Sequence, residues 1–223
     1  MGNSCDKGNL DKHEQGEEGS QISLSSDCEI KSNNDLDKEN SQSVWFRAQK
    51  HIVGQVLQNE QSIKSTFGES AYELLKALYA LMKLHMNSET NVEQVYSHLI
   101  KTIGKIVLIS QQQNLTDKDY KNIYEIIEKS RKIVLTVIGF AQTDYTYNYN
   151  FLKEQLDNCK DLVYQAVSPY LSQKSIERIN FVFHALSSNE FLDSVYDQTV
   201  GETKKVCLRN LVDCLTSFMK RDK

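Results

Sequence analysis

The stretch LIKTIGKIVLIS, residues 99–110, places Lys101 and Lys105 one helical turn apart in a segment that is otherwise mostly apolar. On a helical wheel the two lysines lie at the edge of a second apolar surface that includes Leu108 and Ile109. An ammonium group binds carboxylates and phosphates through charge-assisted hydrogen bonds, whereas its carbon stem packs against apolar surface. Two interpretations follow. Either both lysines extend from a partly buried face to water, or they form a cationic mouth on an apolar interior. Such a mouth suits a ligand with an anionic head and apolar tails.

A second basic face is predicted in residues 44–58, VWFRAQKHIVGQVLQ. On a wheel, Arg47, Lys50 and His51 fall within an arc of about 100°, and the apolar residues fall on the other side. This face could complete the cationic mouth or be an ordinary solvated surface. His51 would carry only part of a charge near neutral pH, because an unperturbed imidazole has a pKa of about 6.5.

The N-terminal residues MGNSCDK match part of a lipidation signal. Gly2 is placed as an N-myristoylation acceptor and Cys5 as a palmitoylation site, although Asp6 stands where the signal usually has Ser or Thr. Two acyl chains would anchor the protein stably, whereas one gives marginal binding. The alternative is an unmodified terminus.

Catalytic and metal-binding chemistry finds little support in the chain. The sequence contains no Gly-rich phosphate loop, no GxSxG and no HExxH, and the five histidines share no metal-ligand spacing. We therefore predict no enzyme activity, no metal and no cofactor beyond a bound phospholipid or fatty acid. His98 and His184 are interpreted as packed or capping residues, and the cysteines at 159, 207 and 214 as reduced core residues.

Charge and composition divide the chain near residue 43. Residues 1–43 carry ten acidic residues and four lysines, a net charge of −6, and contain few apolar residues. Such a segment cannot bury enough apolar surface to offset its ordering entropy, so we predict a disordered acidic tail. Residues 44–223 carry +2 and have a normal globular composition. That small charge argues against nucleic-acid binding.

The body, residues 44–223, is predicted to be all-α. Strand signals are missing and the only proline is Pro169. Capping boxes are expected at Ser70-x-x-Glu73 and Thr90-x-x-Glu93, with a further cap at Thr116. Short connections favour antiparallel neighbours, so the pattern predicts a bundle of about six helices after the short leading helix. No apolar run approaches the roughly 18 residues needed to span a membrane. We expect a cytoplasmic protein that lies peripherally at membranes.

Three longer segments resemble one known family. HLIKTIGKIVLIS, GFAQTDYTYNYNFLKEQLDNCKDLV and SPYLSQKSIERINFVFHALSSNEFLDSVY are similar to segments of the tumour-necrosis-factor-induced protein 8 (TIPE) family, and the likeness runs from about Val44 to Phe218. The acidic tail has no counterpart in it. The resemblance implies an antiparallel bundle around a central hydrophobic cavity. It also implies binding of phospholipids, with acyl chains in the cavity and a phosphoinositide headgroup at a basic entrance.

The resemblance also implies which residues form that entrance. Lys50, Lys101, Lys105, Arg131 and Arg178 match basic positions of the family. His51 and Gln55 replace lysines, while Gln111 and Ile127 replace arginines of some members. Since cations are lost, we expect weaker or altered headgroup selectivity. The predicted headgroup site comprises Arg47, Lys50, His51, Lys101, Lys105 and Arg131.

Two functional hypotheses remain after this comparison. The leading one is a non-enzymatic lipid-binding or lipid-transfer protein that regulates signalling or apoptosis, with phospholipids, the membrane surface and signalling proteins as partners. The alternative is a helical adaptor whose groove receives an amphipathic helix of a partner. An open groove would favour the adaptor, and a closed cavity would favour the lipid-binding protein.

Overall fold

A computed structural model describes residues 59–111, 115–143, 145–197, 199 and 201–221 of the chain. Within these residues the chain forms helices and no strand, which confirms the predicted all-α bundle. The predicted tail at 1–43, the leading helix at 44–58 with Arg47, Lys50 and His51, and the lipidation candidates Gly2 and Cys5 lie outside the described residues.

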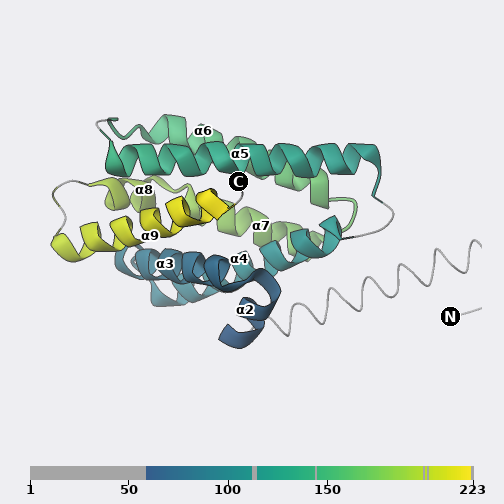
Figure 1. Ribbon diagram of the computed structural model, residues 1–223, viewed down its shortest axis with the longest axis horizontal. Helices are drawn as coiled ribbons and strands as arrows, with labels where there is room; N and C mark the ends of the chain where they lie inside the picture. The colour runs from purple at the N-terminus through teal and green to yellow at the C-terminus, as the bar shows by residue number, and fades with distance from the viewer. Residues whose placement is uncertain (1–58, 112–114, 144, 198, 200, 222–223) are drawn as a thin grey trace, which may run out of the picture. The chain divides into compact units, whose positions relative to one another are not determined.

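The described helices follow one another with short connections (Figure 1). Their bounds are α2 (Glu60–Phe67), α3 (Glu69–His85), α4 (Glu89–Ser110), α5 (Asp117–Gln142), α6 (Tyr149–Val167), α7 (Gln173–Leu186), α8 (Asn189–Tyr196) and α9 (Glu202–Arg221).

Helix starts show where the sequence patterns succeeded and failed. The predicted cap at Thr116 is confirmed as a capping box, in which Thr116 accepts from the Asp119 backbone and Asp119 accepts from the Thr116 backbone. The boxes predicted at Ser70 and Thr90 are wrong. Helix α4 begins at Glu89 because Ser88 caps it, accepting from the backbone N–H of Asn91 at 3.3 Å.

Helix α2 explains the error at Ser70. This short helix, capped by Asn59, was not expected, and it ends at Gly68. Gly68 has a φ of 85°, a conformation that glycine adopts without steric cost, and it lets α3 start directly at Glu69. Buried Ile63 holds α2 against Tyr72 of α3 and Ile100 of α4.

The longer helices pair side by side (Figure 1). Helix α5 lies along α6, α3 along α9, and α4 along α7, with the short α8 packed against α3, α6 and α7. Two larger apolar clusters fill the space between them. One joins α3, α4, α6, α8 and α9 around the fully buried Met82, and the other joins α4, α5, α6 and α7 around Ile179. None of the described helices is both long and apolar enough to cross a membrane.

Candidate functional site

Lys105 on α4 is hydrogen-bonded to the neighbouring helix α7. Its ammonium donates to the hydroxyl of Ser175 at 2.6 Å, and Ser175 lies in the first turn of α7 and is buried. Ser175 in turn shares a hydrogen bond with Ser172 at 3.2 Å. Lys105 therefore links α4 to α7, and its side chain is half-buried rather than fully in water.

Lys101 lies one turn earlier on α4, near His98. Both Lys101 and Arg178 lower the pKa of His98, although burial of the imidazole is the larger cause. His98 packs edge-on against Phe181 of α7, with ring centroids 5.5 Å apart, and its Nδ1 is buried without a hydrogen-bond partner in the described residues. The packing predicted for His98 is confirmed. Lys101, Lys105 and Arg178 together form what we term the α4–α7 basic cluster.

Arg131, the remaining described residue of the predicted headgroup site, lies on α5. Its guanidinium donates to the Glu128 carboxylate at 3.1 Å, one turn earlier on the same helix. Both side chains are about 40 % exposed, at 41 % and 38 %.

An apolar pocket of about 240 Å³ lies among α3, α5, α6, α7, α8 and α9. Its lining is apolar throughout except for the hydroxyl of Tyr196. The described residues do not show the enclosed central cavity that the resemblance implies. The volume falls below the range of about 300–1,000 Å³ that is typical of ligand pockets. The lining residues are Leu74, Leu78, Leu81, Ile133, Val134, Val137, Leu152, Leu156, Leu186, Phe191, Leu192, Val195, Tyr196, Leu208, Leu211 and Leu215.

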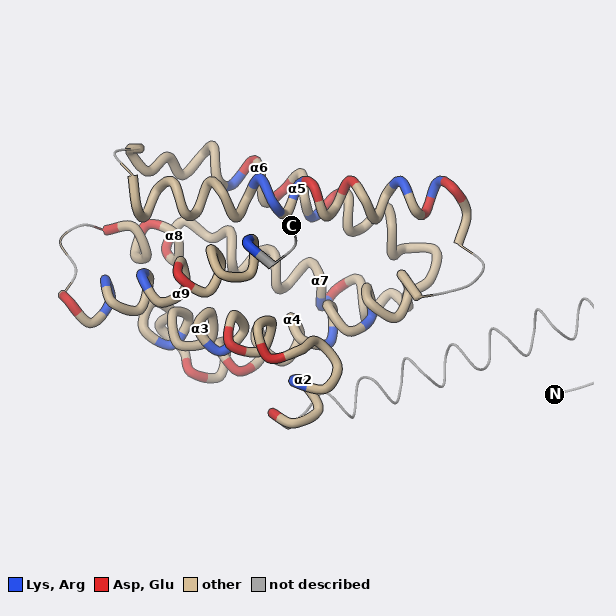
Figure 2. The backbone as a smooth tube through the Cα atoms, viewed as in Figure 1, with Lys and Arg blue, Asp and Glu red and all other residues tan. Residues whose placement is uncertain are grey.

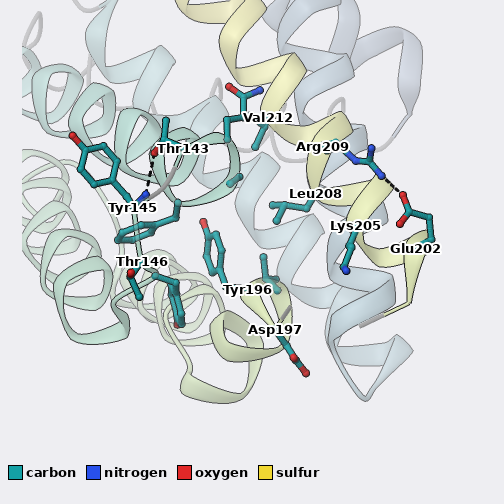
Figure 3. A pocket seen from close by; sticks show the side chains of 15 residues that line it. Thr143, Tyr145, Thr146, Tyr196, Asp197, Glu202, Lys205, Leu208, Arg209 and Val212 are labelled. Carbon is teal, nitrogen blue, oxygen red and sulfur yellow. Dashed lines mark hydrogen bonds and ion pairs between the residues drawn. The ribbon is translucent and has the colours of Figure 1, made fainter. Parts of the chain in front are cut away.

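A larger, polar cleft of about 800 Å³ adjoins this pocket (Figure 3). We term it the α9 cleft. It lies between the end of α5 with the connection to α6, the end of α8, and the first turns of α9. Its lining residues are Phe140, Ala141, Gln142, Thr143, Tyr145, Thr146, Tyr147, Val195, Tyr196, Asp197, Glu202, Lys205, Leu208, Arg209 and Val212.

Stacked aromatic rings form one wall of the α9 cleft. Tyr147 and Tyr196 stack with centroids 4.5 Å apart, and Phe140 meets both rings edge-on. Tyr147 donates its hydroxyl hydrogen to Asp193 at 2.9 Å, and burial together with that bond raises its pKa above the usual value. Tyr145, by contrast, is 72 % exposed. Tyr147 therefore packs into the wall, whereas the Tyr145 side chain remains in solvent.

The opposite wall carries charge from α9. Lys205 and Arg209 stand one turn apart, and Arg209 pairs with Glu202 (Figure 3). Sequence reasoning missed these residues, although KKVCLR repeats the spacing of Lys101 and Lys105 and places Leu208 between the two cations. The same signal could have found them.

The three cysteines in the described residues all have a raised pKa. Burial raises the pKa of the Cys159 and Cys207 thiols, which keeps them protonated. Cys214 is half-buried, and burial is again the main cause of its raised pKa. No group of His, Cys, Asp and Glu in the described residues is arranged to hold a metal ion.

Comparison with known proteins decides the family. A family model described as "Tumor necrosis factor alpha-induced protein 8-like" matches residues 39–222. The chain belongs to this family.

Several relatives agree with this assignment. Tumor necrosis factor alpha-induced protein 8 of Gallus gallus is 30 % identical over 159 residues, which cover 71 % of this chain and 84 % of the relative. The Homo sapiens protein of that name is 28 % identical over 159 residues, 71 % of this chain and 79 % of its own. Tumor necrosis factor alpha-induced protein 8-like protein 1 of Gallus gallus is 23 % identical over 188 residues, 84 % of this chain and 99 % of its own. The family is not a known enzyme family.

Proposed function

We propose that this member of the tumor necrosis factor alpha-induced protein 8 family is a non-enzymatic lipid-binding protein. Family membership supports a role in signalling related to apoptosis. In the proposal an acyl chain enters the apolar pocket, and basic side chains attract an anionic headgroup or membrane surface. The protein would work in the cytoplasm, peripherally at membranes.

The observation that carries the proposal is the apolar pocket itself. Side chains that face an empty space lose dispersion contacts, and apolar cavities of this kind stay dry and accept apolar guests. A hydrocarbon chain would restore those contacts and gain about 0.8 kcal/mol for each CH₂ removed from water. The pocket draws its walls from α3, α5, α6, α7, α8 and α9, so an occupant would touch most of the bundle.

The α4–α7 basic cluster is the described part of the proposed headgroup site. Lys101 and Arg178 face the same imidazole, and Lys105 lies one turn away on α4. In the proposal a phosphate accepts charge-assisted hydrogen bonds from these cations. Phosphoinositides are the headgroups that the resemblance implies, and juxtaposed lysines also strengthen attraction to anionic membranes by about 1 kcal/mol each.

Two measurements test the proposal. Mass spectrometry of organic extracts of the purified protein should detect co-purifying phospholipid or fatty acid. In liposome sedimentation across phosphoinositides, Lys50→Gln/Lys101→Gln should bind less than wild type. The control Lys132→Gln/Lys220→Gln removes the same charge from two exposed lysines and should bind like wild type. Equal binding by all three proteins would defeat the headgroup assignment.

A second candidate function, the helical adaptor, draws on one observation. Helix α5 exposes Tyr120, Tyr124, Ile127 and Leu135 at 53 %, 64 %, 46 % and 58 %. Their spacing places them on one face of the helix, around Arg131. An exposed apolar stripe is typical of a surface that receives a partner helix.

The adaptor predicts that Ile127→Asp/Leu135→Asp abolishes capture of a partner helix and leaves lipid extraction unchanged. Since both side chains are about half exposed, these changes should not unfold the protein. Pull-down with the variant and wild type would show the difference. Loss of lipid binding in this variant would assign the stripe to the lipid or the membrane instead.

A further inference from the structure

The α9 cleft and the apolar pocket share part of their walls. Val195, Tyr196 and Leu208 line both, so the polar cleft leads directly to the apolar interior. Figure 3 shows Tyr196 and Leu208 in the middle of the cleft, between the α5–α6 connection and α9. None of the α4–α7 basic cluster lines the apolar pocket. In Figure 2 the basic segments at the start of α9 and those near α7 lie at opposite sides of the view.

The Tyr196 hydroxyl offers a hydrogen bond at this junction. The ring is fixed by its stack on Tyr147 and its edge contact with Phe140. Tyr147 already donates to Asp193, whereas the Tyr196 hydroxyl has no partner in the described residues. Because Tyr196 lines the cleft and its hydroxyl makes no hydrogen bond within the described residues, that hydroxyl is available to a ligand oxygen.

The charges of the cleft suit a small anionic head. Its two carboxylates are already engaged, because Asp197 accepts from the Thr199 backbone and hydroxyl at 2.8 and 2.7 Å and Glu202 pairs with Arg209. The Lys205 ammonium is exposed and makes no ion pair within the described residues. A carboxylate or phosphate beside Lys205 would therefore meet a cation, and it would compete there with Asp197, whose pKa the Lys205 charge helps to lower.

The size of the apolar pocket limits the tail. A dry cavity of about 150 Å³ accepts benzene, which has six carbons, so 240 Å³ accommodates roughly ten. One short or partly inserted chain fits this space, and two long chains do not.

We propose that the α9 cleft binds the carboxylate or phosphate head of a single-chain amphiphile, with Lys205 and the Tyr196 hydroxyl holding the head and the chain passing Leu208 into the apolar pocket. The proposal rests on the lipid-binding function proposed above and names a ligand class and an entrance for it. Free fatty acids and lysophospholipids share this chemistry.

A displacement assay on the full chain tests the proposal. The probe is a dansyl-labelled undecanoic acid, displaced by saturated fatty acids of 8 to 14 carbons and, in a parallel arm, by lysophosphatidic acid of 12 carbons. Affinity should rise about fourfold for each CH₂ up to roughly ten carbons and then level off, because further carbons lie outside the pocket. The two arms show whether a carboxylate or a phosphate head binds better.

Three variants locate the head. Tyr196→Phe keeps the ring stack but removes the hydroxyl and should weaken binding about tenfold. Lys205→Gln should weaken it about two- to fivefold. The matched control Lys204→Gln removes the same charge one residue away, from a lysine that does not line the cleft, and should bind like wild type. Circular dichroism confirms that each variant is folded.

The outcomes separate this inference from the lipid-binding proposal. If Tyr196→Phe and Lys205→Gln bind like wild type while Lys101→Gln is weakened, the head lies at the α4–α7 basic cluster. The inference is then wrong, and the general function stands. If wild type binds no single-chain amphiphile yet sediments with phosphoinositide liposomes, the inference is again wrong by itself. If it binds neither amphiphile nor liposome and extracts contain no lipid, both proposals fail.

Discussion

Two pairs of basic residues, Lys101 with Lys105 on α4 and Lys205 with Arg209 on α9, have the same spacing but different surroundings. On the α4–α7 side, the Lys105 ammonium donates to buried Ser175, and Lys101 lies near His98, whose ring packs against Phe181. On the α9 side, Lys205 and Arg209 border a cleft that leads to an apolar pocket. Lysine spacing on a helix therefore indicates a basic face, but only the packing behind that face decides whether a ligand can enter.

The largest expected effect distinguishes the packing of the two sides. Leu152 borders the apolar pocket, whereas Ile179 lies in the filled cluster near α7, and both are almost fully buried. Truncating either to alanine should cost about 2–5 kcal/mol in the free energy of unfolding. Leu152→Ala should fall at the lower end, because a side chain beside empty space has fewer contacts to lose. Urea unfolding measures both. A larger loss for Leu152→Ala would mean that the pocket side is packed as densely as the other.

A smaller effect is expected from the polar contact between α4 and α7. A double-mutant cycle of Lys105→Met and Ser175→Ala should give a coupling energy of about 1 kcal/mol, because a charged donor bonds a buried hydroxyl. The same cycle on the exposed pair Glu202 and Arg209 should give almost no coupling, since surface ion pairs are screened by water. Equal coupling energies for the two pairs would mean that the Lys105 contact stabilises the fold no more than the exposed Arg209 ion pair does.

Removing the Glu202 charge from the α9 cleft tests whether Arg209 takes part in binding. Glu202→Gln frees the Arg209 guanidinium and should tighten binding of a single-chain anionic amphiphile about two- to fivefold. The thermal unfolding midpoint should not change, because both side chains are exposed. Fluorescence displacement and thermal melts report the two quantities. Unchanged affinity would argue that Arg209 does not face the bound head.

The smallest expected effect is a pKa change on the α4–α7 side. Burial first, then Arg178 and Lys101, hold the pKa of His98 below its usual value of about 6.5. Lys101→Gln removes the weakest of these causes, so the pKa of His98 should rise slightly while that of His85 stays unchanged. NMR titration of the imidazole protons measures both. An unchanged His98 would place the Lys101 ammonium away from the ring.

The same shift has a consequence for stability. A folded-state pKa below the unfolded value means that the unfolded chain binds the proton first as pH falls. The stability contributed by neutral His98 is therefore present above about pH 6.5 and is lost as pH falls from there toward the lowered pKa. His85, whose pKa burial also lowers, contributes in the same direction. His98→Phe should flatten part of this pH dependence in urea unfolding measured between pH 7 and 5.

Much of the fold could be predicted from interactions between residues that are close in the sequence. The absence of strand signals predicted an all-α bundle, and Thr116 predicted a helix start, because a cap involves only residues a few positions apart. The same rule failed at Ser70, since the backbone turn at Gly68 and the unexpected helix α2 come first. Neighbouring residues compete for the N-cap position of a helix, and here Gly68, whose backbone is less restricted, takes that position instead of Ser70.

The sequence by itself determined the helical class, the family likeness and the spacing of Lys101 with Lys105. Helical periodicity and side-chain chemistry are properties of residues a few positions apart, so they can be read along the chain. Only the tertiary structure placed Ser175 under Lys105, 70 positions away, and put Tyr196 and Leu208 between a polar cleft and an apolar pocket. Those relations depend on how helices pack, because empty space and hydrogen-bond partners arise between elements rather than within them.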